Sequence, residues 1–143
     1  MSVVRPMTEP HLPRHGGIGL VPTMGALHAG HTALFRAARA DCDVLVASLF
    51  VNPVQFSDNG DLAAYPRDFE HDATLAEAEG VDVIFAPSVE EVYPPGFATA
   101  VEVIGLTHRL EGAARGTRHA RGVTTVLTKL LCIALPNVAA CCQ

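Results

Sequence analysis

The chain has 143 residues, of which 49% are hydrophobic and 17% are charged, and its formal net charge is −5. This length fits one domain with a single core, and the apolar composition excludes an intrinsically disordered chain. The negative charge argues against binding to nucleic acids or to membrane surfaces. The cysteines form no CxxC pair, which indicates free thiols in a reducing cytoplasm, and the N-terminus lacks a secretory signal pattern.

The first third of the sequence predicts two strands joined by a helix. Residues 1–17 contain three prolines and no hydrophobic period, so we expect a loose N-terminal arm. Residues 18–21 predict a short buried strand that ends at Pro22. Residues 31–41 place apolar side chains on one helical face. Residues 43–51 are an almost continuous apolar run, which is typical of a strand buried on both faces of a parallel sheet.

The middle of the chain predicts a loop, two helices and two strands. Residues 52–68 form a long polar loop, and loops of this length in compact domains are usually functional. Residues 69–80 predict a helix that ends at a glycine, and residues 81–87 predict another buried strand. Residues 88–94 begin with a capping box, which predicts a short helix. Residues 99–105 alternate weakly and predict an outer strand.

The last third predicts a helix over residues 122–135 and a strand over residues 137–142. Strands that alternate with helices imply βαβ units. We therefore expect an α/β fold with a Rossmann-like parallel sheet, helices on both of its faces and three layers. One nucleotide-binding domain would extend over residues 18–143.

The stretch VPTMGALHAGH, residues 21–31, lies between the first predicted strand and the first helix. Ligands of open α/β sheets bind at the carboxyl ends of strands. Gly25 and Gly30 allow a ligand to approach the backbone closely, and the helix N-terminus after Gly30 favours a phosphate group. His28 and His31 lie beside this helix end, where their imidazoles can donate hydrogen bonds to phosphate oxygens.

This stretch matches neither the GxxxxGK[ST] nor the GxGxxG phosphate loop. The remaining template is HxGH, the signature of the adenylyl- and nucleotidyl-transferring α/β superfamily. Two alternatives stay open, namely one capping histidine beside one surface histidine, and a zinc site. No acidic or cysteine partner lies nearby in the sequence, so we predict no metal ligands among these residues.

Longer motifs surround the histidine pair, and they occur in one order along the chain. The segments are PTMGALHAGH (22–31), SLFVNPVQF (48–56), DLAAYPRD (61–68), VIFAPSVEEVYPPG (83–96) and LEGAAR (110–115). Together they resemble the pantothenate synthetase (pantoate–β-alanine ligase) family, from about residue 18 to about residue 140.

The resemblance implies an ATP-dependent condensation of pantoate with β-alanine that requires Mg²⁺. The pantoate carboxylate attacks the α-phosphorus of ATP, which gives pantoyl adenylate and pyrophosphate. The amine of β-alanine then attacks the activated acyl carbon and releases AMP. It also implies a cytoplasmic homodimer.

The resemblance also assigns roles to single residues. The turn that contacts ATP would consist of Met24, Gly25, Ala26, Leu27, His28, Ala29, Gly30 and His31. His28 and His31 would be catalytic, because they donate to the phosphate oxygens as negative charge builds up, and His31 matches the proton donor of the family.

A second set of residues would bind the other substrates. Gln55 matches the residue that binds pantoate and β-alanine, and its amide both donates and accepts hydrogen bonds. Asn52 lies three residues earlier and would assist it. Pro22 and Met24 would form an apolar wall of the pantoate pocket. The alternative for Gln55 and Asn52 is a structural turn around Pro53.

The sequence departs from the family pattern R-P-x-H-F-x-G-V within residues 110–126. Here Gly116 follows Arg115, one extra residue precedes His119, and Ala120 replaces a phenylalanine. This basic stretch either binds phosphate, forms a dimer contact, or is a solvated loop.

A second departure follows residue 137, where the family continues into G-E-K-D and S-S-R segments and a small C-terminal domain. The sequence instead reads VAACCQ, so we expect a fold truncated before that domain and little turnover by this chain alone. Two alternative functions stay open. One is a non-catalytic remnant that binds nucleotide weakly or only dimerises. The other is a different adenylyl-transferring enzyme, against which the NPVQF motif argues.

Overall fold

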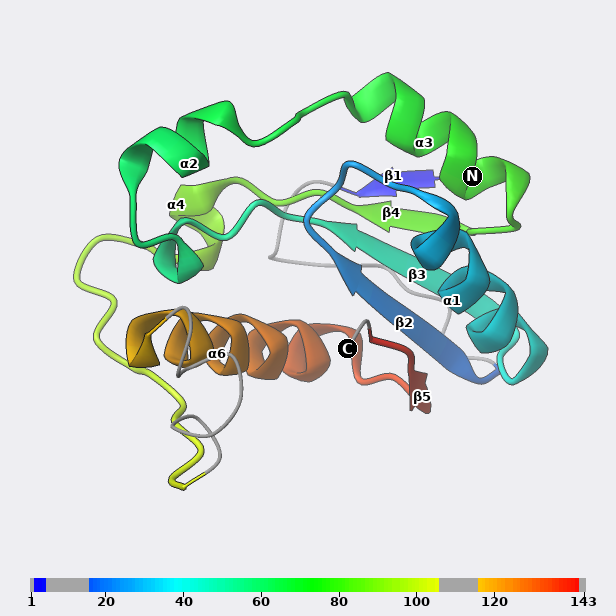
Figure 1. Cartoon of the computed structure of the whole chain (residues 1–143). Coiled ribbons are helices and arrows are strands. Elements are labelled where there is room, and N and C mark those ends of the chain that lie inside the picture. The colour runs from blue at the N-terminus through cyan, green and yellow to red at the C-terminus, as the bar shows by residue number, and fades with distance from the viewer. Residues whose placement is uncertain (1, 5–15, 106–115, 142–143) are drawn as a thin grey trace.

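A five-stranded parallel sheet forms the centre of the computed structural model, which describes residues 2–4, 16–105 and 116–141 (Figure 1). The strand order is β1-β4-β3-β2-β5, and every neighbouring pair is parallel. The strands are β1 (Ser2–Val4), β2 (Ile18–Thr23), β3 (Val44–Leu49), β4 (Val83–Phe85) and β5 (Val138–Ala139). The predicted α/β class with a parallel sheet is confirmed.

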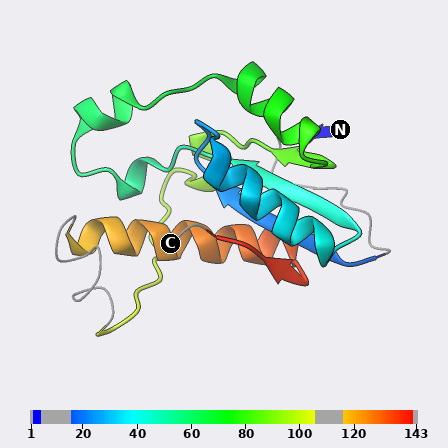
Figure 2. The ribbon, with the colours of Figure 1, turned by 45° about the vertical axis from the view of Figure 1, so that its right-hand side comes forward.

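Helices cover both faces of this sheet, which confirms the predicted layers (Figure 2). They are α1 (Ala29–Ala40), the 3₁₀ turn η1 (Pro53–Gln55), α2 (Asn59–Ala64), α3 (Phe69–Ala78), α4 (Val89–Val92) and α6 (Thr117–Ala134). Adjacent strand residues face opposite sides. Val21 packs in the core beneath α1 and α3, whereas Leu20 packs in the core beneath α4 and α6.

Two predictions near the N-terminus are wrong. The expected loose arm over residues 1–17 contains strand β1, which pairs with β4 from Ser2 opposite Val83 to Val4 opposite Phe85. The prolines that suggested an irregular arm all follow this strand in the sequence, within residues 5–15, which lie outside the described part.

Pro22 also does not end its strand, because β2 continues to Thr23. The carbonyl of Leu20 accepts a hydrogen bond from the N–H of Ala140 at 3.0 Å, so this side of β2 faces β5. Residues two apart in a strand face the same side. The N–H that Pro22 lacks would therefore lie on the β5 side, beyond Leu20, where the pairing with β5 ends.

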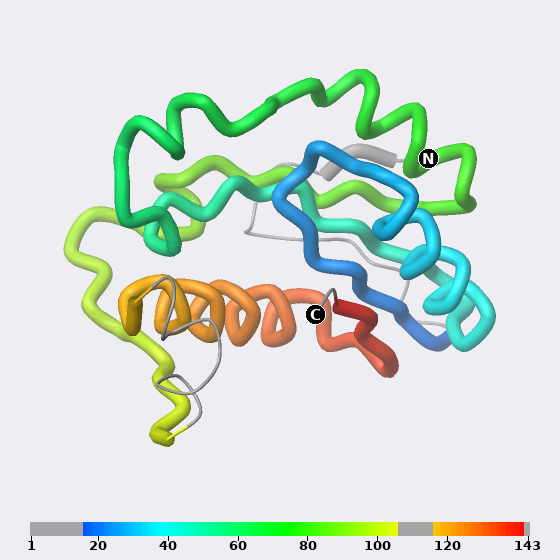
Figure 3. The backbone as a smooth tube through the Cα atoms, viewed as in Figure 1, coloured from blue at the N-terminus to red at the C-terminus, as the bar shows by residue number. Residues whose placement is uncertain are grey.

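Three other segments differ from their prediction. Residues 52–68 contain η1 and α2 rather than an open loop. Residues 99–105 form no strand, because Val101 bonds instead to threonines of α6: its N–H donates to Thr125 Oγ1 at 3.0 Å and its carbonyl accepts from Thr124. Figure 3 shows this segment passing beside α6, which begins at Thr117 and therefore earlier than predicted.

The order of the strands indicates where an open α/β sheet of this kind binds its ligand. The chain proceeds from β2 outward through β3 to β4, and later returns to place β5 on the other side of β2. The strand order therefore reverses between β2 and β5, and open α/β sheets bind ligands at such a switch point. The carboxyl end of β2 leads directly into the histidine turn and α1.

Candidate functional site

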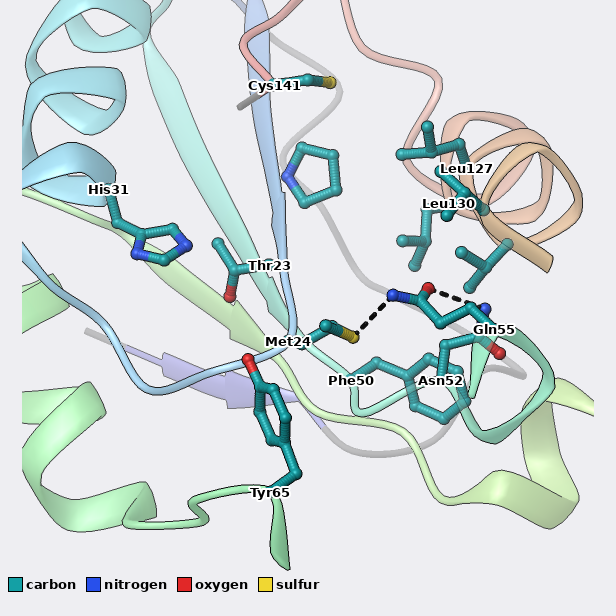
Figure 4. A pocket seen from close by; sticks show the side chains of 13 residues that line it. Thr23, Met24, His31, Phe50, Asn52, Gln55, Tyr65, Leu127, Leu130 and Cys141 are labelled. Atoms are coloured by element: carbon teal, nitrogen blue, oxygen red, sulfur yellow. Dashed lines mark hydrogen bonds between the residues drawn. The ribbon is translucent and has the colours of Figure 1, made fainter. Parts of the chain in front are cut away.

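A cavity of about 230 Å³ lies at the carboxyl ends of β2 and β3 and beside α6 (Figure 4). Its walls consist of Pro22, Thr23, Met24, His31, Phe50, Asn52, Gln55, Tyr65, Val123, Val126, Leu127, Leu130 and Cys141. The structure thus brings together five residues that were predicted from separate motifs: Pro22, Met24, His31, Asn52 and Gln55. The apolar wall that α6 supplies was not predicted. Residues 122–135 predicted a helix, but nothing in their sequence indicated which element that helix packs against.

The two histidines form the capping box of α1. His28 is the N-cap, and its Nδ1 accepts a hydrogen bond from the N–H of Gly30 at 3.0 Å. His31 reaches back, and its Nδ1 accepts from the N–H of His28 at 3.3 Å. The ring centroids are 4.2 Å apart. Histidine here takes the positions that Ser or Thr and Glu or Gln usually fill.

These hydrogen bonds fix the tautomer that each ring has in its neutral form. A ring nitrogen that accepts an N–H carries no proton, so each neutral imidazole keeps its proton on Nε2. Burial lowers the pKa of His31, the neighbouring His28 lowers it further, and Asp72 opposes both. Figure 4 shows the ring of His31 extending from α1 towards the end of β2 at Thr23. An Nε2–H donor is therefore available at the cavity.

The turn before α1 is held by side chains from other elements. The N–H of Gly25 donates to Thr23 Oγ1 at 3.2 Å. The N–H groups of Ala26 and Leu27 both donate to the carboxylate of Asp72 in α3, which is 3% exposed. Sequence reasoning missed Asp72 and treated it as part of an ordinary helix.

The predicted ATP-contacting residues differ in exposure. The side chain of Leu27 packs in the core, whereas Met24 and Ala26 are half-buried. His28, Ala29 and Gly30 are exposed at the helix start. Contact of this turn with ATP stays a prediction. The N–H groups of residues 25–28 and 30 already donate hydrogen bonds to side chains of the protein. The histidine ring donors are therefore better suited to that contact than these N–H groups.

Asn52 is a buried junction, with 1% of its surface exposed. Its Oδ1 accepts from the N–H of Val54 at 3.3 Å and from the hydroxyl of Tyr93 at 2.9 Å. Its Nδ2 donates to Gln55 Oε1 at 3.1 Å and to the carbonyl of Gly122 at 3.1 Å. Asn52 therefore holds the side-chain amide of Gln55 in place through this hydrogen bond. Tyr93 and Gly122 take part in this arrangement and were not predicted.

Gln55 lies in η1 at its packing contact with α6. Its Nε2 donates to the sulfur of Met24 at 3.0 Å (Figure 4). A Cβ added to Gly122 would lie 2.9 Å from both the Cα and the backbone N of Gln55, so only glycine allows this approach. His119 Nδ1 lies 2.8 Å from the carbonyl oxygen of Gln55.

The basic stretch that departs from the family pattern is helical from Thr117 onward, so the solvated-loop interpretation is wrong there. His119 is buried against Gln55, whereas Arg118 and Arg121 are exposed. Arg115 lies outside the described residues, and so does the rest of the stretch over 106–115.

A second cavity of about 460 Å³ adjoins the first. Its walls are Met24, Gln55, Phe56, Ser57, Asp61, Tyr65 and His119. Met24, Gln55 and Tyr65 line both cavities, so Gln55 borders two separate spaces. Asp61 contributes a carboxylate to the second space.

Two other kinds of feature are absent from the described part of the chain. No three His, Cys, Asp or Glu side chains gather there into a group that could hold a metal ion. Among those residues, no helix combines the length and the hydropathy that crossing a bilayer requires.

Comparison with known proteins gives a consistent result. The chain matches the family model described as pantoate-beta-alanine ligase over residues 2–143. It is 59% identical over 122 residues to a pantothenate synthetase of Moorella thermoacetica, which covers 85% of this chain and 43% of that protein.

Solved structures agree with this match. A crystal structure of pantothenate synthetase from Thermus thermophilus superposes with a TM-score of 0.91 at 49% identity, over 97% of this chain and 51% of that chain. A pantoate-beta-alanine ligase from Francisella tularensis, complexed with beta-gamma ATP and beta-alanine, gives 0.89 at 36% identity and covers 97% and 55%. The chain spans about half the length of the curated relatives it matches.

Proposed function

The chain belongs to the pantoate-beta-alanine ligase family, and we propose that it carries the histidine and pantoate-binding parts of a site that condenses pantoate with β-alanine. The reaction uses ATP and passes through pantoyl adenylate. One observation carries this proposal: a single cavity at the switch point of the sheet is lined by Pro22, Met24 and His31 from the motif at residues 22–31 and by Gln55 from the motif at residues 48–56.

In the first step, a pantoate carboxylate oxygen attacks the α-phosphorus of ATP. A P–O bond forms to pantoate, the bond to the β-phosphate breaks, and pyrophosphate leaves. Negative charge builds on the phosphate oxygens, and the Nε2–H donors of His28 and His31 stabilise it. Because the capping box already orients both rings, little reorganisation accompanies the reaction.

In the second step, the amine of β-alanine attacks the acyl carbon of pantoyl adenylate. A C–N bond forms, the C–O bond to the phosphate of AMP breaks, AMP leaves with the bonding electrons, and the amine releases its proton to water. Gln55 borders both cavities, so its amide is placed to contact pantoate on one side and β-alanine on the other. Pro22 and Met24 supply an apolar wall against the methyl groups of pantoate.

Mg²⁺ enters this proposal together with ATP. Among the described residues, no three His, Cys, Asp or Glu side chains gather into a group that could hold the ion. We therefore assign no step to it and treat it as part of the nucleotide substrate. A cytoplasmic homodimer remains part of the proposal from family resemblance alone.

A single-turnover assay tests the proposed function. The chain is held in excess over ATP, so that even slow chemistry yields measurable pyrophosphate. We expect pyrophosphate and pantoyl adenylate to form only when pantoate is present. His31→Ala should slow their formation, whereas His71→Ala, which removes an exposed histidine of α3, should not. Pyrophosphate formation that is independent of pantoate, or equal in both variants, would contradict the proposal.

A further inference from the structure

A buried carboxylate lies directly beneath the histidine turn. Asp72 Oδ2 accepts from the N–H of Ala26 at 2.9 Å, and its Oδ1 accepts from the N–H of Leu27 at 2.8 Å. The residue is 3% exposed, and its charge is met within the described part of the chain by these backbone donors rather than by a salt bridge. Both oxygens are thus committed to the same two-residue segment.

The backbone beside these donors adopts φ angles that most residues avoid. Gly25 and Ala26 have φ angles of 83° and 51°, so both lie in the left-handed region. Alanine avoids this region because its Cβ crowds the following carbonyl oxygen. At Gly25, an added Cβ would lie 2.8 Å from Asp72 Oδ2, so the carboxylate sits where only a glycine leaves room.

The shape of this segment decides where the imidazoles lie. Leu27 is followed at once by His28, the N-cap of α1, and the capping box then fixes His31. We propose that Asp72 is a positioning residue of the site, whose carboxylate holds the turn Gly25–Leu27 so that the rings of His28 and His31 meet the phosphate oxygens of ATP. The identity of the ligand rests on the proposed function, whereas the geometry does not.

The charge of Asp72 supplies an independent readout. It raises the pKa of His31, whereas burial and His28 lower it. Replacement of the carboxylate by a neutral amide should therefore move the His31 titration to lower pH. Loss of an acid that does not act on His31, such as Asp68 of the same helix, should leave this titration unchanged.

The test compares Asp72→Asn with Asp68→Asn. Asp68 is the N-cap of the same helix and accepts one N–H, from His71 at 3.0 Å, so it controls for loss of an acid from α3. Asparagine at position 72 keeps one acceptor but turns an NH₂ group towards a backbone N–H. We expect hydrogen-exchange protection of the amides of Ala26 and Leu27 to fall about tenfold or more.

In Asp72→Asn the titration midpoint of His31, followed through its ring Cε1–H signal, should fall, and the affinity for ATP should weaken. Asp68→Asn should change none of the three quantities. A folded Asp72→Asn variant with unchanged exchange at both amides and an unchanged His31 midpoint would overturn the inference. If ATP does not bind the unsubstituted chain, the proposed function fails, and exchange and titration still decide the role of Asp72.

A measurement without substitution covers the case in which Asp72→Asn does not fold. Scalar couplings across hydrogen bonds should connect the amide nitrogens of Ala26 and Leu27 to the carboxyl carbon of Asp72 in the unsubstituted chain. Absence of both couplings would overturn the inference.

Discussion

His31 serves the helix and the ligand through different ring nitrogens. Its Nδ1 accepts the N–H of His28, and its Nε2–H is left to donate at the cavity. His31→Ala should therefore slow adenylation by about two to three orders of magnitude, the usual cost of one lost donor to developing charge. It should also lower the free energy of unfolding by about 1 kcal/mol through loss of the hydrogen bond that His31 accepts in the capping box.

His31→Glu separates the two effects, because glutamate also serves at this position of a capping box and has no N–H donor in its side chain when ionised. Its unfolding free energy should stay near that of the unsubstituted chain, while adenylation stays slow. Single-turnover rates and urea unfolding measure the two quantities. Full adenylation activity in His31→Glu would remove the catalytic role of the imidazole.

The pKa of His31 also makes stability depend on pH. Its folded pKa is lowered from 6.5, so below that pH the unfolded chain binds a proton more readily than the folded chain. The contribution is fully present above pH 6.5 and is lost as pH falls through the lowered pKa. Urea unfolding at about pH 7.5 and about pH 5.5 should show a smaller loss for His31→Gln than for the unsubstituted chain. Equal losses would contradict this origin.

Gln55 provides a third prediction at this scale. Gln55→Ala should weaken the binding of pantoate by roughly 1–3 kcal/mol, because the amide borders the cavity and its hydrogen bonds would be lost. Calorimetric titration with pantoate and with ATP measures the effect. A loss of ATP affinity with unchanged pantoate affinity would require a different role for Gln55.

At the scale of elements, the contact between α6 and η1 positions Gln55 at the wall of the cavity. Gly122→Ala places a methyl group 2.9 Å from the backbone of Gln55, and overpacking of this kind costs about 1–3 kcal/mol. Alanine favours a helix, so an effect of propensity alone would stabilise the chain. Urea unfolding distinguishes the two signs. Arg121→Ala, at an exposed neighbouring position, should change stability by less than about 0.5 kcal/mol.

The element pattern shows what could be predicted from sequence. The apolar run 43–51 and the capping box at Ser88 identified β3 and α4 correctly, because both signals come from residues that are neighbours in the sequence. The motifs also placed His31 and Gln55 at one edge of the sheet. Asp72 and Tyr93 were missed because their roles depend on partners 46 and 41 residues away, to which no local period points.

At the scale of the whole molecule, the chain holds the histidine turn and a cavity at the switch point of the sheet, and it spans about half the length of its curated relatives. The G-E-K-D and S-S-R segments expected from the family resemblance lie outside its sequence. We expect a polypeptide of residues 1–143 on its own, which spans about half the length of those relatives, to turn over far below about 1 s⁻¹, the lower end for typical enzymes. Pyrophosphate release should rise when the remaining half of a relative is added as a second polypeptide. A rate typical of enzymes for the chain alone would show that those segments are dispensable.

The most direct test of the central claim is a nuclear magnetic resonance titration of the chain with ATP and then with pantoate. ATP should shift the ring Cε1–H signals of His28 and His31 and leave that of His71 in place, because only the first two border the switch point of the sheet. Pantoate should then shift the methyl signal of Met24 inside the cavity. Equal shifts at all three histidines, or a Met24 signal that pantoate does not move, would contradict the account.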